Sequence, residues 1–192
     1  MFNEKASSAD MAAASVETNI GVRDQVDAGG VYAIECYDSE GNLKWREETH
    51  NLVVNVGLQD MNTQYFKGSS YVAAWYIGLI TGPGSGVTIA AADTMSSKTW
   101  SENTSYSNAT RPTATFGTAT TANPSVISNS ASVAQFNING TATIAGAFLV
   151  NNSTKGGTSG TLFSASKFTS PGDRAVSSGD TLNVTYTFSL AG

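Results

Sequence analysis

Apolar and polar residues alternate most clearly near the C-terminal end of the chain, between residues 181 and 190. Leu182, Val184, Tyr186 and Phe188 fall on one face of this segment, and Asn and Thr residues fall on the other. A period of two residues is typical of a half-buried β-strand. Further strand candidates share β-branched or aromatic residues and are separated by Gly, Asn, Ser and Pro. They are residues 111–119, 131–138, 142–150 and 161–168.

A β-hairpin is predicted earlier in the chain, where residues 31–37 and 43–47 have strand character and enclose a polar turn. Asp38, Glu40 and Asn42 alternate in that turn as they would in a calcium-binding loop. The later Glu of an EF-hand is missing, however, because the chain continues into the second strand. We therefore interpret the segment as a plain hairpin turn.

One short helix is predicted after the hairpin. Asn55 can cap it, and Leu58, Met61 and Tyr65 recur at intervals of three and four residues, with Phe66 alongside. This spacing is typical of a helix.

The next two segments contrast in polarity. Residues 71–80 form an apolar run that ends in a Gly- and Pro-rich turn, which predicts a buried strand. Residues 92–111 are rich in Ser, Thr and Asn and have weak periodicity. We expect a long surface loop there, and a loop of that length is usually functional or disordered.

The first 29 residues differ from the rest of the chain and predict an extended N-terminal arm. They contain several charges and an Ala-rich stretch, and the pair Gly29-Gly30 precedes the first strand pattern. An isolated helix this short is marginal in water, so we expect the arm to be ordered only against a partner. Residues 30–192 then form one all-β domain. Its strand pattern predicts an antiparallel β-sandwich, jelly-roll-like, with one short helix.

Composition narrows the class of protein. Charged residues make up 13% of the 192 residues, about half the usual share, and the abundant Ser, Thr, Asn and Gly argue against a helical bundle. The net charge is -5 without any run of Lys or Arg, so we expect no nucleic-acid partner. No apolar stretch reaches the ~18 residues of a membrane span, so we expect no membrane partner. The start of the chain lacks a secretory signal, which predicts synthesis in the cytoplasm.

Candidate catalytic groups are few, and we predict that the protein is not an enzyme. His50 is the only histidine, and we interpret it as a structural hydrogen-bonding residue. Cys36 is the only cysteine, and we interpret it as a small buried residue. Glu47 and Glu48 are neighbours on a strand, so they point to opposite faces and do not form a carboxylate pair. We expect neither a metal site nor a cofactor.

The aromatic residues carry the only binding signal in the sequence. Two interpretations stay open: a platform on which a saccharide stacks, or core and subunit-interface residues, and we favour the second. The candidates are Tyr65, Tyr71, Trp75, Tyr76, Trp100 and Tyr106, of which Trp75, Tyr76, Trp100 and Tyr106 are the main interface or receptor candidates.

Several segments taken together resemble virion structural proteins of tailed bacteriophages. The similarity spans roughly residues 30–190 and rests on turn and strand residues. It is carried by residues 50–58, 75–79, 93–95, 128–131, 156–162 and 178–186. The resemblance implies a small β-rich head decoration or cement protein, or a part of a tail or fibre. It carries over no catalytic residue.

The expected function is therefore that of a capsid decoration protein in the virion, which binds the assembled head and stabilises it. The expected partners are the major capsid protein and further copies of the chain, in a homotrimer seated where capsomers meet. The arm is expected to supply contacts through Phe2, Met11, Ile20 and Val22. The alternative is a tail or head-fibre component that binds a glycan of the host surface.

Overall fold

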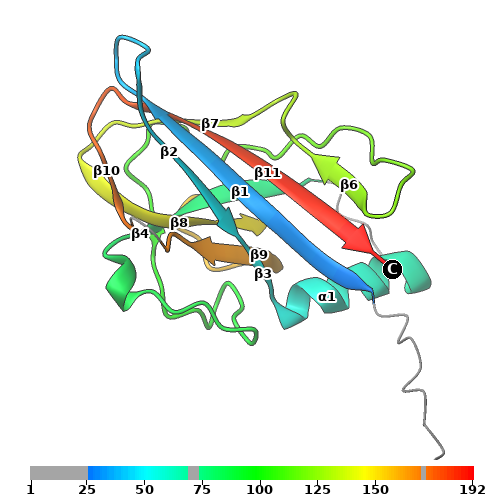
Figure 1. The fold of residues 1–192 in the computed structure, drawn as a ribbon. Coiled ribbons are helices and arrows are strands. Elements are labelled where there is room, and N and C mark those ends of the chain that lie inside the picture. Colours follow the sequence, from blue (N-terminus) through cyan, green and yellow to red (C-terminus); the bar gives the residue numbers. More distant parts are fainter. Residues whose placement is uncertain (1–25, 69–73, 170–171) are drawn as a thin grey trace, which may run out of the picture.

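Two antiparallel sheets face each other in the computed structural model, which describes residues 26–68, 74–169 and 172–192 (Figure 1). The fold is all-β and sandwich-like, with one short α-helix, as predicted. The jelly-roll order of the strands stays a prediction. Within the described ranges, no helix combines the length and apolar character needed to cross a membrane.

The first sheet, called sheet A, contains five strands in the order β2-β1-β11-β6, and β7 also pairs with β11. The long central strand β11 pairs with β7 near its start and with β6 near its end. The strands of sheet A are β1 (Asp27–Tyr37), β2 (Leu43–His50), β6 (Ser125–Ser128), β7 (Ala134–Asn137) and β11 (Thr181–Ala191).

The second sheet, called sheet B, contains six strands in the order β3-β9-β8-β4-β5, and β10 also pairs with β8. Its strands are β3 (Leu52–Val53), β4 (Tyr76–Thr81), β5 (Glu102–Asn103), β8 (Ala142–Val150), β9 (Leu162–Lys167) and β10 (Arg174–Val176). All of the pairings in both sheets are antiparallel.

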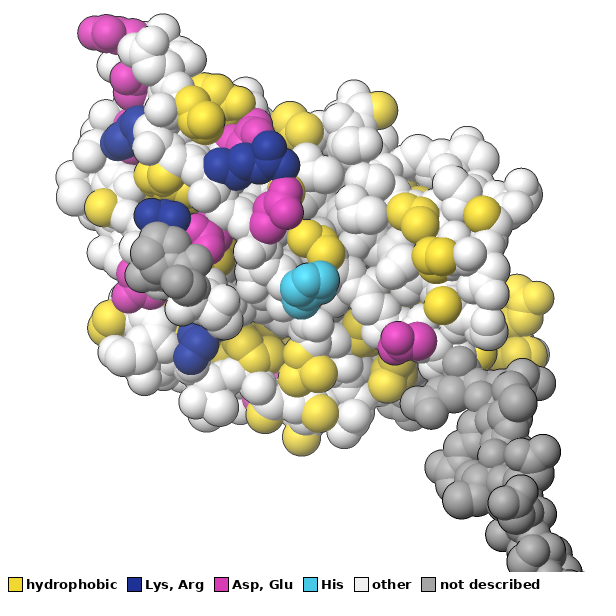
Figure 2. Space-filling model, viewed as in Figure 1, with side chains coloured by type: hydrophobic (Ala, Val, Ile, Leu, Met, Phe, Trp, Pro, Cys, Tyr) yellow, Lys and Arg dark blue, Asp and Glu magenta, His cyan; other side chains and the backbone are white. Residues whose placement is uncertain are grey.

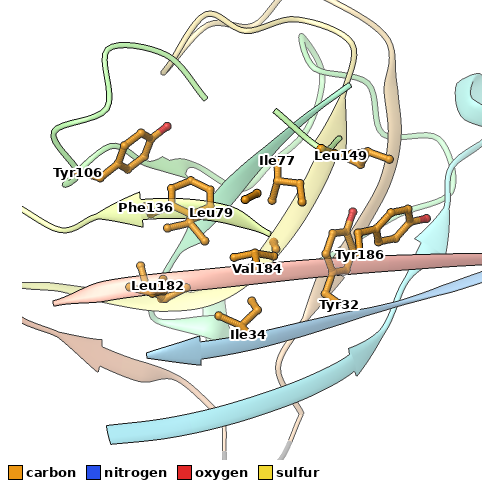
Figure 3. Close-up of a cluster of buried hydrophobic side chains, with 14 of the residues drawn as sticks. Tyr32, Ile34, Ile77, Leu79, Tyr106, Phe136, Leu149, Leu182, Val184 and Tyr186 are labelled. Atoms are coloured by element: carbon orange, nitrogen blue, oxygen red, sulfur yellow. The ribbon is translucent and has the colours of Figure 1, made fainter. Parts of the chain in front are cut away.

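The main core lies between the two sheets (Figure 3). Sheet A supplies every second residue of its long strands, such as Ile34 and Val184, because alternate side chains point to the same face. Sheet B supplies Ile77, Leu79 and Leu149. The alternation in residues 181–190 thus correctly predicted a strand with one face in the core.

A second apolar cluster lies on the outer face of sheet B, where residues 82–111 cover the strands. We call this segment the loop layer. Its Val87, Met95 and Trp100 pack with Ile80 and Phe148 of the sheet. Sheet B is therefore buried on both faces, which explains why residues 144–150 of β8 are all buried.

Helix α1 (Asn55–Asn62) continues into a π-helical turn, η1 (Thr63–Lys67), so the helical segment lies where it was predicted. The predicted cap was wrong, because Val54 is the N-cap residue and no side chain caps the helix. The helix approaches sheet B through Gly57, where an added Cβ would lie 2.4 Å from the carbonyl oxygen of Phe163.

The predicted strand at 111–119 is not a regular strand. The segment crosses from one sheet to the other. The Ile77 N–H donates to the carbonyl of Pro112, and the Gly117 N–H donates to the carbonyl of Ser128 in β6. Pro112 has no backbone N–H, so it cannot donate a hydrogen bond to a neighbouring strand, and regular strand pairing is interrupted there. The short strands β5, β6 and β10 were not predicted.

The arm boundary at residue 29 needs correction, because β1 begins at Asp27 and includes Gly29 and Gly30. An added Cβ at Gly30 would lie 2.8 Å from the hydroxyl of Tyr186, so this glycine allows a close approach rather than a break. The predicted arm contacts Phe2, Met11, Ile20 and Val22 lie outside the described residues, as does Tyr71.

Candidate interaction surface

A cavity of about 600 Å³ opens at the end of the sandwich where α1 lies, and we call it the end pocket. Both sheets and the helical segment contribute to its wall. The wall is mainly apolar and includes Met61, Trp75, Phe116, Ile127, Phe163 and Phe188. Pockets of this size and character are the usual binding sites of folded proteins.

Aromatic rings in edge-to-face contact build this wall. Trp75 lies 5.5 Å from Phe163 between ring centroids, and Phe163 lies 5.3 Å from Phe188. Phe116, in the crossing segment, lies 6.2 Å from Tyr186. Such pairs are favoured by the aromatic quadrupole and hold one another in place. The rings come from four separate segments, so the pocket is a product of the fold.

Two polar residues of the helical segment complete the end pocket. The Gln64 amide Nε2 donates to Asp60 Oδ1 at 3.3 Å. The side-chain oxygen of Gln64 is buried and has no hydrogen-bond donor among the described residues. Asp60 is the only charged residue that the described part of the chain contributes to the wall. The pocket therefore combines apolar area with one carboxylate and one amide.

An exposed aromatic pair lies on the same helical segment. Tyr65 and Phe66 are 83% and 77% exposed, and their rings meet edge to face at 4.9 Å. Leu58, seven residues before Tyr65, is also exposed. We call these three residues the α1 patch. Because apolar residues at this spacing share a helix face, they form one exposed surface.

The helical spacing of Leu58, Tyr65 and Phe66 was recognised in the sequence, but their exposure was not predicted. Phe116, Phe163 and Phe188 were not predicted as site residues. No local signal distinguishes them from ordinary strand residues.

The predicted aromatic candidates do not come together in one place. Trp75 lines the end pocket, and Tyr76 in β4 packs, half-buried, against the second apolar cluster. Trp100 is buried, with its Nε1 donating to Asp93 Oδ2 at 3.1 Å, and Tyr106 is fully buried. A receptor or interface role for Trp100 and Tyr106 is therefore corrected, because both belong to the interior.

The loop layer is held in place by a buried ion pair, which is why it is not a free surface loop. The guanidinium of Arg111 donates to both carboxylate oxygens of Glu102, at 3.0 and 2.7 Å, and both side chains are inaccessible to solvent. Arg111 also donates to the carbonyl oxygens of Asn152 and Gly157, each at 2.8 Å. A charge this fully paired has a structural role.

Two other acidic side chains, Glu47 and Asp38, are also tied to structural partners. Glu47 is buried and accepts two hydrogen bonds from Arg174, whereas Glu48 is exposed, so the two carboxylates face opposite ways as predicted. Asp38 accepts the backbone N–H of Asn42 at 2.8 Å, which confirms the plain hairpin turn. Among the described residues, no three His, Cys, Asp or Glu side chains lie close enough to hold a metal ion.

His50 and Cys36 differ in how they match the predictions. The His50 side chain is exposed, and its hydrogen bond is made by its backbone carbonyl, which accepts from Ser166 Oγ. Its predicted side-chain role is therefore corrected. Cys36 is fully buried, as predicted. Burial and the nearby Asp180 carboxylate raise the pKa of its thiol to about 12, so it is not a nucleophile at neutral pH.

Charge is unevenly distributed over the surface. On the face in Figure 2, Lys, Arg, Asp and Glu gather toward the hairpin between β1 and β2, and few lie toward the α1 end. The α1 end is thus the less charged part of this face.

No family model, curated protein or solved structure matches the chain.

Proposed function

We propose that the chain is a non-enzymatic structural subunit of a tailed-phage virion, which binds the assembled head as a decoration or cement protein. The observation that carries the proposal is the α1 patch, an exposed aromatic pair beside an open apolar pocket. Large exposed apolar side chains that cluster in this way mark protein interaction sites. The resemblance of the chain to virion structural proteins directs the proposal to the phage head.

The low surface charge supports a subunit that packs beside copies of itself. Only 13% of the residues are charged, so neighbouring copies repel one another little. A subunit that binds only the assembled shell stabilises that shell by mass action. A homotrimer with three α1 patches would gain further from multivalency, since all three contacts must break before release.

The test compares two variants in binding to purified heads that lack the protein. Tyr65→Ser with Phe66→Ser removes the aromatic pair, and Leu43→Ser removes an exposed apolar residue of the hairpin end as a matched control. Losing two central aromatic contacts should weaken co-sedimentation with heads at least about tenfold. The control should bind like the unaltered protein.

Heat stability of the heads gives the second readout. Heads carrying the unaltered protein or the Leu43→Ser variant should retain DNA to a higher temperature than bare heads. Heads mixed with the double variant should resemble bare heads. Equal heat stability with and without the unaltered protein would remove the cement role. If the double variant bound heads as well as the unaltered protein does, the contact with the head would lie outside the α1 patch.

A second candidate function, a tail or head-fibre component that binds a host-surface glycan, is favoured by Trp75. This ring lines an open pocket that also contains Asp60 and Gln64, and sugar rings stack on aromatic faces while their hydroxyls bond to such groups. Glycan-array binding that is lost in Trp75→Ala but kept in Tyr65→Ser would favour it. Trp100→Ala would not be informative, because Trp100 is buried.

A further inference from the structure

We infer that the end pocket is the docking site of the chain's own N-terminal arm, with Ile20 and Val22 in the pocket and Arg23 beside Asp60. The inference concerns the free subunit and does not depend on head binding. It commits to one occupant, a segment of the same chain, and three observations on the described residues support it.

The first observation is the place where the arm begins. Val26, the residue before β1, is 68% exposed, and Asp27 pairs with Ala191 at the end of β11. Phe188, three residues earlier on β11, lines the end pocket. Strand geometry places this ring only about 10 Å along the strand from the start of the arm.

The second observation is the length of chain available. Three residues lie between Val22 and Val26, and the four steps from one to the other span up to about 14 Å when the chain is extended. An arm that folds back at Val26 therefore reaches the pocket with Ile20 and Val22. A tether this short gives a high effective concentration, so docking within one chain is favoured over docking on another copy.

The third observation is the chemistry of the pocket wall. Ile20 and Val22 are two residues apart, so in an extended segment they point to the same side, as an apolar pocket requires. Arg23 follows them directly, and Asp60 is the only charged residue among the described residues of the wall. The buried side-chain oxygen of Gln64 has no hydrogen-bond donor among the described residues. A backbone N–H of a docked peptide can donate to this oxygen, whereas a hydrocarbon ligand has no such group.

The test uses the full chain with the photoreactive residue p-benzoylphenylalanine in place of Ile20. Irradiation at low protein concentration, followed by digestion and mass spectrometry, identifies the segment that position 20 contacts. The matched control places the same photoreactive residue at Ser8, in the arm but twelve residues further from the domain. Both substitutions lie outside the described sandwich, so they leave its core residues unchanged.

The expected result is a cross-link within one chain from position 20 to segments that contain Trp75, Phe116 or Phe188. The yield should be at least about tenfold higher than from position 8, because the tether holds only the nearer segment at the pocket. A cross-linked dimer would overturn the inference and assign the pocket to a second copy. Equal yields from the two positions, or no cross-link to the pocket wall, would also overturn it.

Discussion

The aromatic residues of the loop layer are buried, whereas those of the α1 patch are exposed. The loop layer packs mainly on the outer face of sheet B, and its Tyr106 reaches the core between the sheets, against Phe136. In the loop layer Trp100 and Tyr106 are buried, and the indole N–H of Trp100 has a carboxylate partner. At the α1 end Tyr65 and Phe66 extend into solvent beside an open pocket. Aromatic residues with satisfied partners indicate structure, whereas exposed ones beside a cavity indicate an interaction surface.

Polar groups show the same difference. Arg111 of the loop layer has its guanidinium shared among a carboxylate and two carbonyl oxygens. Gln64 at the α1 end has a buried oxygen without a donor among the described residues. A fully satisfied network fixes one arrangement, while an unsatisfied group marks a place where a partner can add a hydrogen bond. Substitutions in the two regions should therefore affect different measurements.

The largest effect is expected at the buried ion pair. Arg111→Met leaves the Glu102 carboxylate buried with only the Gly156 N–H at 2.8 Å and the Tyr106 hydroxyl as partners. Breaking such a pair should lower the free energy of unfolding by about 3–5 kcal/mol. Urea denaturation measures this loss.

Arg46→Met is the matched control for the ion-pair prediction. Arg46 pairs with Glu48 at 2.7 Å on the surface, where both side chains are more than half exposed. Such a pair contributes less than about 1 kcal/mol. If Arg111→Met were as stable as Arg46→Met, the loop layer would not depend on its buried charge, and the contrast between the two regions would fail.

A smaller loss is expected for Trp100→Phe. The substitution removes the hydrogen bond to Asp93 and part of the ring that packs on Phe148 at 5.1 Å. The free energy of unfolding should fall by about 1–2 kcal/mol. Trp75→Phe at the half-buried pocket wall is the control and should cost less. The opposite ranking would show that the pocket wall stabilises the fold more than the loop layer does.

Much of the fold could be predicted from the sequence, because the long strands have one face in the core. Residues 142–150 and 181–190 were predicted within one residue of β8 and β11. The loop layer could not be predicted, since its burial depends on contacts between distant residues such as Trp100 and Phe148. Its Ser-, Thr- and Asn-rich composition resembles that of a free loop, yet these side chains bond to one another and to the backbone.

The interaction surface was less predictable than the fold. Trp75 was a candidate, but its neighbours Phe163 and Phe188 come from strands far away in the sequence. Tyr65 has the spacing of a buried helix residue, and only the tertiary structure shows that α1 faces sheet B with Gly57 instead. Periodicity predicts that an element has an apolar face. It does not predict whether the fold covers that face.

Alkaline pH should destabilise the protein partly through the buried tyrosine of the loop layer, Tyr106. Burial, together with the nearby Glu102 carboxylate, raises the pKa of Tyr106 above its usual value of 10.0. The protonated phenol therefore stabilises the folded state below pH about 10, and this stabilisation is lost as the pH rises further. The loss for one such group is at most about 1.4 kcal/mol per pH unit.

Tyr106→Phe should accordingly reduce the alkaline decrease in the free energy of unfolding. Trp100→Phe is the matched control, because it alters the loop layer without removing an ionisable group and should keep the alkaline decrease. Urea denaturation of both variants between pH 8 and about 11 measures the slopes. An equal reduction in the two variants would mean that the tyrosine of the loop layer is not the group that resists ionisation.

The smallest effect on stability is expected for the double variant Tyr65→Ser, Phe66→Ser. These side chains are 83% and 77% exposed, so removing them should change the free energy of unfolding by less than about 0.5 kcal/mol. Two buried aromatic residues of the same size would each cost about 3–5 kcal/mol. Thermal and urea denaturation should therefore match those of the unaltered protein, while binding to the partner falls. A loss of more than about 2 kcal/mol would mean that the pair stabilises the helical segment itself, and the α1 end would then resemble the loop layer.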